Sequence, residues 1–195
     1  MSLRIIAGAH RGRKLIAPEG REIRPTSARA RESLFNILAH GVATADGASP
    51  LIGARVLDGF CGTGALGLEA LSRGAAFVTF LDTSPEAMKA VSENLRAMDM
   101  QKQAAMVRAD AISPPQSRQP CSLVFLDPPY RSGLIPKALL ALQGKGWIAP
   151  GALICAELAA TEDLLPPDGF VQIDERRYGA AKIVLARAQE MPAQG

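Results

Sequence analysis

The sequence predicts an α/β fold in which a mostly parallel sheet is covered by helices on both faces and ends in an antiparallel hairpin. Short, almost continuously apolar runs alternate with helix-like segments over residues 55–157, which is typical of parallel strands that are buried on both faces. The last two apolar runs are too close together for a crossover helix, so we expect them to pair antiparallel. A hydrophobic fraction of 48% in 195 residues is sufficient for one sizeable core.

Strands and helices are expected to alternate along most of the chain. Each strand is assigned to an apolar run, and each helix to a segment in which apolar residues recur every three or four positions. The expected strands are Arg55–Leu57, Phe77–Leu81, Ala105–Arg108, Ser122–Leu126, Ala152–Glu157, Phe170–Asp174 and Lys182–Ala186. The expected helices are Ala65–Arg73, Pro85–Met98 and Leu134–Leu142, and Glu175–Gly179 would connect the final two strands.

The first 40 residues are expected to form a small basic extension to this sheet. Apolar stretches at Leu3–Ile6 and Lys14–Ala17 flank the basic segment Gly8–Arg13, which predicts a hairpin with a basic tip. Residues 1–31 contain eight Lys or Arg and two Glu, a net charge of +6; since the whole chain carries +3, the other residues carry −3. This concentration is typical of a surface that binds a polyanion, although a merely solvated basic face is the alternative.

A helix is expected between this hairpin and the main sheet. Thr26 or Ser27 would cap it, and it would end near Ala39. Residues 1–40 would thus be the extension, 41–53 a linker, 54–189 the main domain and 190–195 a disordered tail.

We expect a soluble cytoplasmic protein that acts as a monomer. Neither an apolar run of signal-peptide length at the start nor a stretch of about 18 apolar residues that could cross a membrane occurs. Cys61, Cys121 and Cys155 are odd in number and lack CxxC spacing, so buried thiols are expected rather than a disulfide framework or a zinc site. No other metal site is indicated.

A glycine-rich loop follows the first expected strand. The segment Asp58–Gly64 leads into the helix that starts near Ala65, and together with Gly67 it satisfies the pattern GxGxxG. Glycines at these places permit a tight turn and let a ligand approach the backbone. Asp82 follows about 20 residues later, as in a dinucleotide-binding fingerprint. The pattern fits a nicotinamide dinucleotide or S-adenosylmethionine, because both contain adenosine.

Acidic residues follow three consecutive expected strands, at Asp58, Asp82 and Asp110. Asp58 could attract the ammonium of a methionine moiety, whereas it would repel a pyrophosphate. Asp82 could accept hydrogen bonds from ribose hydroxyls, and Asp110 could accept one from the adenine amino group. The three acids therefore favour S-adenosylmethionine, and the alternative is that they are helix caps or turn residues.

The fourth expected strand runs directly into Asp127-Pro128-Pro129-Tyr130. In an open α/β sheet the ligand crevice lies beyond the carboxyl ends of the strands, so this tetrapeptide should face the same crevice as the glycine loop. The Asp127 carboxylate and the Pro128 carbonyl could accept the N–H groups of an exocyclic amine, and the Tyr130 ring could stack on a flipped base. An ordinary turn is the alternative. The combination predicts methyl transfer to an amino group of a nucleic-acid base.

With these motifs the sequence resembles the RsmD-type 16S ribosomal RNA guanine-N2 methyltransferases. The resemblance spans nearly the whole chain, and its most restricted parts are Arg4–Gly8, Arg11–Leu15, Arg24–Thr26 and Arg31–Asn36. It implies a Rossmann-like, seven-stranded class I methyltransferase fold with S-adenosylmethionine as methyl donor. It also implies a guanine of 16S ribosomal RNA as the target, in the small ribosomal subunit or its assembly intermediate.

The resemblance also implies roles for individual residues. The guanine would be held at the catalytic centre by Asp127, Pro128, Pro129 and Tyr130. The cofactor would be bound by Arg24, Thr26, Asp58, Phe60, Gly62, Gly64, Asp82, Thr83, Asp110 and Ala111, and RNA phosphates by Arg4, Arg11, Arg13 and Lys14. Ala7 and His10 differ from the residues that are common at these places in the family.

Other functions stay open at this level. An NAD(P)-binding protein would explain the glycine pattern and Asp82, but it gives no role to the tetrapeptide and sets Asp58 against a pyrophosphate. A non-catalytic RNA-binding assembly factor would keep the fold without transferring a methyl group. Adenine N6 in DNA or RNA and glutamine in a protein are rival substrates, although such relatives typically begin the tetrapeptide with Asn where this chain has Asp127.

Overall fold

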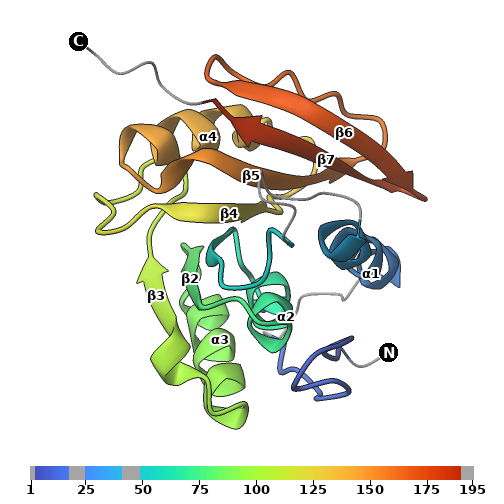
Figure 1. Ribbon diagram of the computed structural model, residues 1–195, viewed down its shortest axis with the longest axis vertical. Helices are drawn as coiled ribbons and strands as arrows, with labels where there is room; N and C mark the ends of the chain where they lie inside the picture. Colours follow the sequence, from blue (N-terminus) through green and yellow to red (C-terminus); the bar gives the residue numbers. More distant parts are fainter. Residues whose placement is uncertain (1–2, 18–24, 41–48, 190–195) are drawn as a thin grey trace.

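Seven strands form one mixed sheet in the order β3-β2-β1-β4-β5-β7-β6. The computed structural model describes residues 3–17, 25–40 and 49–189 (Figure 1). The strands are β1 (Arg55–Gly59), β2 (Phe77–Asp82), β3 (Ala104–Arg108), β4 (Cys121–Leu126), β5 (Ile148–Ala159), β6 (Phe170–Tyr178) and β7 (Ala181–Ala188). The first five strands pair parallel, and β7 pairs antiparallel with both β5 and β6. The expected α/β fold with a terminal antiparallel hairpin is confirmed.

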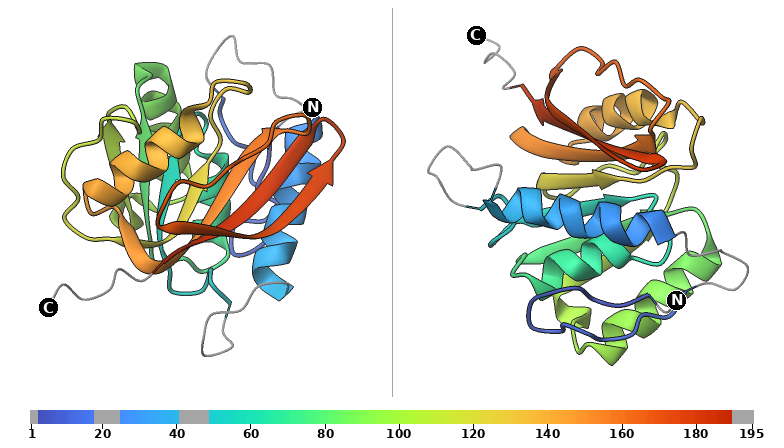
Figure 2. Two further views of the ribbon diagram at one scale, coloured as in Figure 1. Left: turned by 90° about the horizontal axis from the view of Figure 1, so that it is seen from above. Right: turned by 90° about the vertical axis from the view of Figure 1, so that its right-hand side faces the viewer.

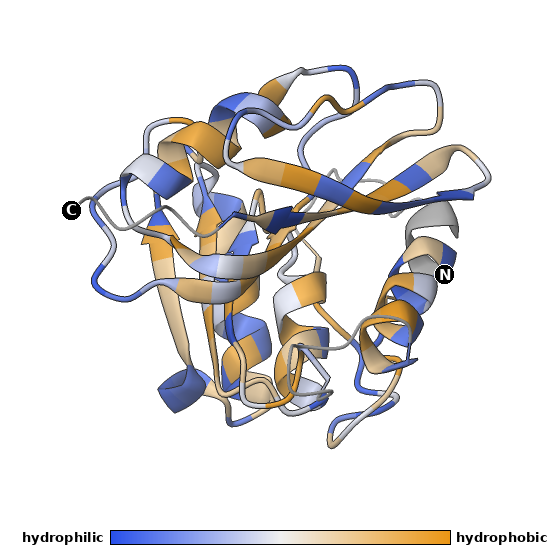
Figure 3. Cartoon of the chain, turned by 45° about the horizontal axis from the view of Figure 1, so that its top comes forward, coloured by the Kyte–Doolittle hydropathy of each residue, from blue (hydrophilic) through white to orange (hydrophobic). Residues whose placement is uncertain are grey.

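Helices cover both faces of this sheet (Figure 2). They are α1 (Pro25–His40), α2 (Ala65–Ser72), α3 (Pro85–Ala97) and α4 (Leu134–Gly144), together with the short 3-10 helix η1 (Gln101–Gln103). Apolar residues of α1, α2 and α3 form one core cluster with one face of the strands, and those of α4 form a second cluster with the other face. Figure 3 shows that hydrophobic residues are concentrated in the central strands and that hydrophilic residues are frequent in the loops.

Most expected elements are found within two residues of their predicted bounds, and the end of the sheet differs more. The expected connection Glu175–Gly179 is wrong, because β6 continues to Tyr178 and only Gly179 and Ala180 separate it from β7. Strand β5 is longer than expected at both ends, and its last residues pair with β7 up to Ala159 opposite Ala181. Because a two-residue turn joins β6 to β7, these antiparallel strands can pair from the turn outward. Both β6 and β7 therefore extend beyond their apolar runs.

Helix α1 begins two or three residues earlier than expected, at Pro25 instead of after a cap at Thr26 or Ser27. Proline is favoured at the first position of a helix, because its fixed φ suits the helix and its missing N–H would have no partner there. The ring of Phe35 from α1 lies 5.7 Å from that of Phe125 in β4, measured between centroids. This contact brings α1 onto the sheet.

Residues 3–17, called the N-terminal arm below, run out and back antiparallel as expected. The amide of Ile5 donates to the Arg13 carbonyl at 2.9 Å, and that of Leu15 donates to the Leu3 carbonyl at 2.8 Å. The arm is nevertheless no regular hairpin, because its β-pairing is limited to an isolated bridge between Arg4 and Lys14.

Buried polar side chains of α2 and α3 hold the N-terminal arm. The carboxylate of Glu69, which is 0% exposed, accepts hydrogen bonds from the amides of Ile6 at 2.7 Å and Ala7 at 3.0 Å. The side-chain amide of Asn94 both accepts from and donates to the backbone of Ile16, at 2.8 and 2.9 Å. The arm is therefore attached to the outer side of the two helices.

Some expectations concern residues that lie outside the described part of the chain. These are most of the expected linker (41–48), the expected tail (190–195) and Arg24. The buried location expected for Cys61, Cys121 and Cys155 is confirmed, and burial raises the pKa of the Cys121 thiol to about 11. Within the described ranges, no helix has the length and apolar character that a membrane span needs.

Candidate active site

The glycine loop and the tetrapeptide meet at the carboxyl edge of the sheet. Strand β1 lies between β2 and β4, and its last residue, Gly59, is in register with Leu81 on one side and Leu126 on the other. The amide of Asp127 lies 3.5 Å from the Gly59 carbonyl oxygen. The structure therefore brings the two motifs side by side, although β2, β3 and β4 lie between them along the chain.

Left-handed backbone shapes the glycine loop. Gly62 and Gly64 have φ values of 52° and 74°, which only glycine adopts without strain. Phe60 has φ 59° and is a non-glycine residue in the same region. Gly67 serves packing instead, because a β-carbon there would lie 2.7 Å from Cγ1 of Val78. The third glycine of the pattern thus lets α2 approach β2 closely.

Asp58 is a buried acid beneath this loop. It is 1% exposed, and one carboxylate oxygen accepts a hydrogen bond from the Gly67 amide at 2.8 Å, in the first turn of α2. Burial raises the pKa of Asp58 well above its usual value, the charges of Asp127 and Asp82 raise it further, and the bond from Gly67 opposes them. Asp58 is therefore both a helix cap and an acidic group that a nearby cation would stabilise in its charged form.

The other two acids at strand ends also bind backbone amides. The two carboxylate oxygens of Asp82 accept hydrogen bonds from Gly62 and Ser84, both at 2.9 Å. One oxygen of Asp110 accepts a hydrogen bond from Ile112 at 3.0 Å. Each acid thus has the turn or cap role that the alternative interpretation expected. A carboxylate oxygen has two lone pairs, so these contacts leave acceptor capacity for a ligand.

Two further predicted cofactor residues adjoin these acids. Thr83 is exposed directly after β2, and Ala111 is buried. Thr26 lies in the first turn of α1, and its side chain, like the whole of Arg24, is outside the described part of the structure.

The tetrapeptide presents alternating exposed and buried residues. Asp127 and Pro129 are exposed, Pro128 is buried, and Tyr130 is half-buried. The hydroxyl of Tyr130 donates a hydrogen bond of 2.8 Å to Oε1 of Glu157 in β5. The sequence analysis did not single out Glu157. Its position at the end of the fifth expected strand was a possible signal, because Asp58, Asp82 and Asp110 also lie at strand ends.

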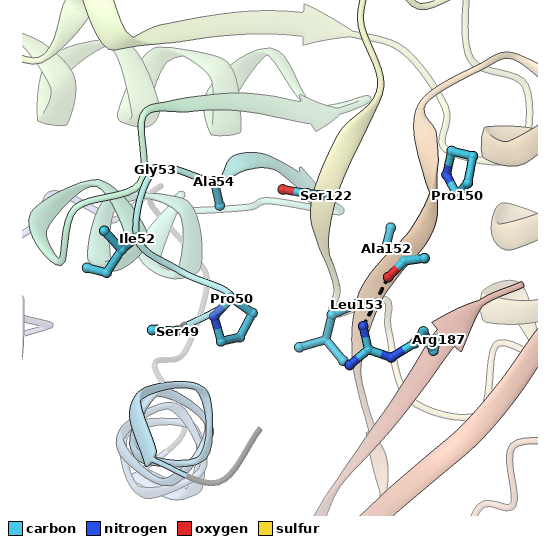
Figure 4. A pocket seen from close by; sticks show the side chains of 11 residues that line it. Ser49, Pro50, Ile52, Gly53, Ala54, Ser122, Pro150, Ala152, Leu153 and Arg187 are labelled. Carbon is cyan, nitrogen blue, oxygen red and sulfur yellow. Dashed lines mark hydrogen bonds between the residues drawn. The ribbon is translucent and has the colours of Figure 1, made fainter. Parts of the chain in front are cut away.

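Two cavities lie at opposite ends of the strands. A small one of about 80 Å³ lies next to the tetrapeptide and is lined by Tyr130 and Glu157. A larger one of about 270 Å³ lies at the amino ends of β1, β4 and β5 and is lined by Ser122 and Arg187 (Figure 4). Arg187 donates to the Gly151 carbonyl there at 3.1 Å. The carboxyl edge is the usual ligand site of an open α/β sheet, so we assign the candidate site to that edge.

The predicted RNA-binding residues all lie on the N-terminal arm and are exposed: Arg4, Arg11, Arg13 and Lys14. Two of them make contacts within the protein. Arg4 donates to the Gly12 carbonyl at 2.9 Å, and Arg13 donates to the Ala97 carbonyl at the end of α3. The tip of the arm lies at the C-terminal ends of α2 and α3, which point away from the carboxyl edge of the sheet. No group of side chains suited to hold a metal ion occurs in the residues that the structure describes.

The strand order, the glycine loop and the tetrapeptide at the carboxyl edge define a class I methyltransferase fold. The family model described as Conserved hypothetical protein 95 matches residues 3–187, and the chain belongs to this family.

Named relatives agree with this assignment. The chain is 35% identical over 181 residues to Ribosomal RNA small subunit methyltransferase D of Haemophilus influenzae, which covers 91% of this chain and 89% of the relative. It is 40% identical over 165 residues to the Escherichia coli protein of the same name, and the match covers 84% of this chain and 78% of the relative. The solved structure of yhhF from Escherichia coli has a TM-score of 0.80 and 33% identity, over 98% of this chain and 100% of that one. The resemblance to the RsmD-type family is confirmed.

Proposed function

We propose that the protein transfers the methyl group of S-adenosylmethionine to the exocyclic N2 amino group of a guanine in 16S ribosomal RNA. The names of the relatives support ribosomal RNA as the substrate class. The observation that carries the proposal is the contact between the tetrapeptide and the end of β1, where the Asp127 amide lies 3.5 Å from the Gly59 carbonyl oxygen. An acceptor group for an amine and a loop for an adenosyl cofactor therefore adjoin.

The residues of the glycine loop suit S-adenosylmethionine. Bound S-adenosylmethionine supplies a methyl group on a positively charged sulfonium. The buried carboxylate of Asp58, with its raised pKa, favours a cationic ligand beside it. Asp82 would accept from the ribose hydroxyls and Asp110 from the adenine amine, while Gly62 and Gly64 leave the backbone open to the ligand.

The tetrapeptide would orient the reacting amine. The Asp127 carboxylate and the Pro128 carbonyl would accept its two N–H groups and turn the nitrogen lone pair toward the methyl group. The prolines have no N–H that would compete for these acceptors, and their fixed φ keeps the carbonyl in place. As the N–C bond forms and the S–C bond breaks, Asp127 would take the proton that the nitrogen loses. The ring of Tyr130 would stack on the flipped base.

The N-terminal arm would bind RNA at some distance from this centre. Helix α3 has 13 residues and is therefore about 20 Å long. The tip of the arm lies at its far end, so a substrate that contacts both the tip and Asp127 must span roughly that length. A folded ribosomal RNA meets this requirement and a single nucleoside does not.

The test is transfer of labelled methyl from S-adenosylmethionine to small ribosomal subunits that lack this modification, followed by nucleoside analysis. We expect N2-methylguanosine, and Asp127→Ala should abolish its formation while the affinity for the cofactor stays near normal. Label in N6-methyladenosine or in protein would overturn the substrate. Absence of label from RNA, DNA and protein would favour the non-catalytic RNA-binding factor, and equal loss of transfer and cofactor binding in Asp127→Ala would contradict the assigned roles.

A further inference from the structure

The side chain of Glu157 connects strand β5 to the tetrapeptide. Glu157 lies near the carboxyl end of β5, opposite Ile183 of β7, and its Oε1 accepts the 2.8 Å hydrogen bond from the Tyr130 hydroxyl. Because β5 is paired on both sides, by β4 and β7, the backbone that carries Glu157 is held firmly in the sheet. The far end of the Tyr130 side chain is therefore fixed to a rigid element.

The backbone that follows Tyr130 is held by a second carboxylate. Arg131 has φ 59°, a left-handed conformation that a non-glycine residue adopts only when its surroundings enforce it. Its amide donates to Oε1 of Glu162 at 2.8 Å, and Oε2 of the same carboxylate accepts from the amide of Ala159 at 2.9 Å. Glu162 thus ties the turn after the tetrapeptide to the end of β5, independently of Glu157.

A buried positive charge accompanies Glu157. Arg31 of α1 is 6% exposed and donates to the Arg4 carbonyl at 2.8 Å. Burial lowers the pKa of Arg31, the charge of Arg73 lowers it as well, and the charges of Glu69 and Glu157 act in the opposite direction. The negative charge of Glu157 therefore interacts favourably with a guanidinium that the protein itself provides, which lowers the cost of keeping a carboxylate half-buried.

We infer that Glu157 is a positioning residue that sets the Tyr130 ring in the orientation in which it receives the target base, while Glu162 fixes the adjoining backbone. This inference rests on the proposed function. A tyrosine ring has two side-chain torsions, and a hydrogen bond at its hydroxyl restricts both. Because the ring is held before the base arrives, the conformational entropy of the Tyr130 side chain is lost during folding and not during catalysis.

The kinetic test compares the single variants Glu157→Ala, Glu157→Gln and Tyr130→Phe with the double variant Glu157→Ala/Tyr130→Phe. Tyr130→Phe keeps the ring and removes only the hydroxyl. Asp168→Ala removes an exposed acid from the neighbouring β5–β6 connection and is the matched control. A hydrogen bond to a charged group is worth enough to change a rate by roughly tenfold or more. We expect Glu157→Ala and Tyr130→Phe each to lower kcat on RNA by about that factor with the Kd for S-adenosylmethionine unchanged, and Glu157→Gln to recover most of the loss.

The double variant decides whether the two residues act through their mutual bond. We expect it to be no worse than either single variant, because each alone already removes the bond. Losses that multiply, or full activity in Glu157→Ala, would overturn the inference. Thermal unfolding of each variant shows whether it is folded; should Glu157→Ala fail to fold, Tyr130→Phe carries the test, and full activity of that variant would overturn the inference as well.

A spectroscopic measurement separates this inference from the proposed function. The chain has two tyrosines, so incorporation of 3-fluorotyrosine gives two ¹⁹F resonances, and Tyr178→Phe assigns them. We expect Glu157→Ala to shift and narrow the Tyr130 resonance, Glu157→Gln to restore it largely, and Asp168→Ala to leave it unchanged. An unaltered Tyr130 resonance in Glu157→Ala would refute the positioning role even if methyl transfer to RNA is found, and failure of methyl transfer in the unmodified protein would refute the proposed function whatever the resonance does.

Discussion

At the scale of single residues, the buried carboxyl group of Asp58 makes the stability of the protein depend on pH. Its pKa is raised, first by burial and then by Asp127 and Asp82. A folded-state pKa above the unfolded value means that folding favours the protonated form. This contribution to stability is complete below the unfolded pKa of about 3.9 and is lost as the pH rises through the folded-state pKa. At neutral pH the buried carboxylate therefore destabilises the fold, and a cationic ligand of the kind proposed would offset this cost.

Replacement of Asp58 by Asn tests this assignment. The amide oxygen still accepts from Gly67, so the cap of α2 is kept while the charge is lost. We expect Asp58→Asn to match the unmodified protein in Tm near pH 4 and to exceed it increasingly toward neutral pH. Its Kd for S-adenosylmethionine should rise roughly 10- to 100-fold, the value of a charge-assisted hydrogen bond. A variant with lower Tm at pH 7 and unchanged Kd would show that capping is the whole role of Asp58.

At the scale of elements, the N-terminal arm depends on close approach to α2. Gly8 has φ 85°, and a β-carbon at that position would overlap the Ser72 carbonyl, whereas Gly12 has φ 82° and open space around it. The amide of Ala9 donates to the same Ser72 carbonyl at 2.8 Å. The two glycines share a backbone conformation and differ in their surroundings, so they form a matched pair.

Substitution of these glycines separates backbone strain from displacement of the arm. Gly12→Ala should cost about 1–2 kcal/mol from the left-handed conformation alone. Gly8→Ala should cost distinctly more, because the arm must move and the bonds from Ile6 and Ala7 to Glu69 are disturbed. Urea unfolding measures the two losses, and hydrogen exchange of the Ile6 and Ala7 amides should accelerate only in Gly8→Ala. Equal losses with equal exchange would mean that the arm is not anchored at Ser72.

At the scale of the whole molecule, basic and acidic residues lie at opposite ends of the layer formed by α2 and α3. The basic tip of the arm lies at the C-terminal ends of these helices, whereas the acids Asp58, Asp82 and Asp127 lie at the carboxyl edge of the sheet. If the arm binds RNA as proposed, such a division would attract the RNA backbone to the arm and repel it from the acidic edge of the sheet. Only a base that is flipped out of the stack would then enter the site.

Salt dependence of RNA binding tests the role of the arm. Arg11 and Lys14 are chosen because Arg13 also bonds to α3. The double variant Arg11→Ala/Lys14→Ala should bind RNA more weakly, and the slope of log K against log salt should become shallower by roughly 0.7–0.9 for each phosphate that is no longer neutralised. Arg118→Ala/Lys145→Ala removes the same charge from exposed residues outside the arm, near the amino ends of β4 and β5, and should leave the slope unaltered. Equal slopes in all three proteins would exclude the arm as the phosphate-binding surface.

Much of the fold was predictable, because periodicity and turn residues report local structure directly. The buried runs at Phe77–Leu81 and Ser122–Leu126 became strands close to their expected bounds, as parallel strands covered on both faces do. The end of β6 was missed, because Glu175-Arg176-Arg177 looks like a polar connection and is in fact an exposed edge strand held by β7. These residues are polar because β6 is an edge strand exposed to solvent, and not because they form a turn.

The candidate site was predictable where its residues form a continuous motif, and not where it depends on contacts. The glycine loop and the tetrapeptide were found from residue type and spacing. Glu157 and Glu162 were missed, because a single acid after a strand carries no pattern of its own. The roles of Asp82 and Asp110 as backbone acceptors were considered only as an alternative, and the structure shows these bonds.

The sequence by itself determined the alternation of strands and helices, the loop that suits an adenosyl ligand, the tetrapeptide that suits an amine, and the basic start of the chain. Each of these depends on neighbours within a few positions. The tertiary structure alone decided that Tyr130 bonds to Glu157, 27 residues away, and that Ala7 bonds to Glu69, 62 residues away. Such contacts depend on strand order, register and helix packing, which bring distant residues together and which no local pattern encodes.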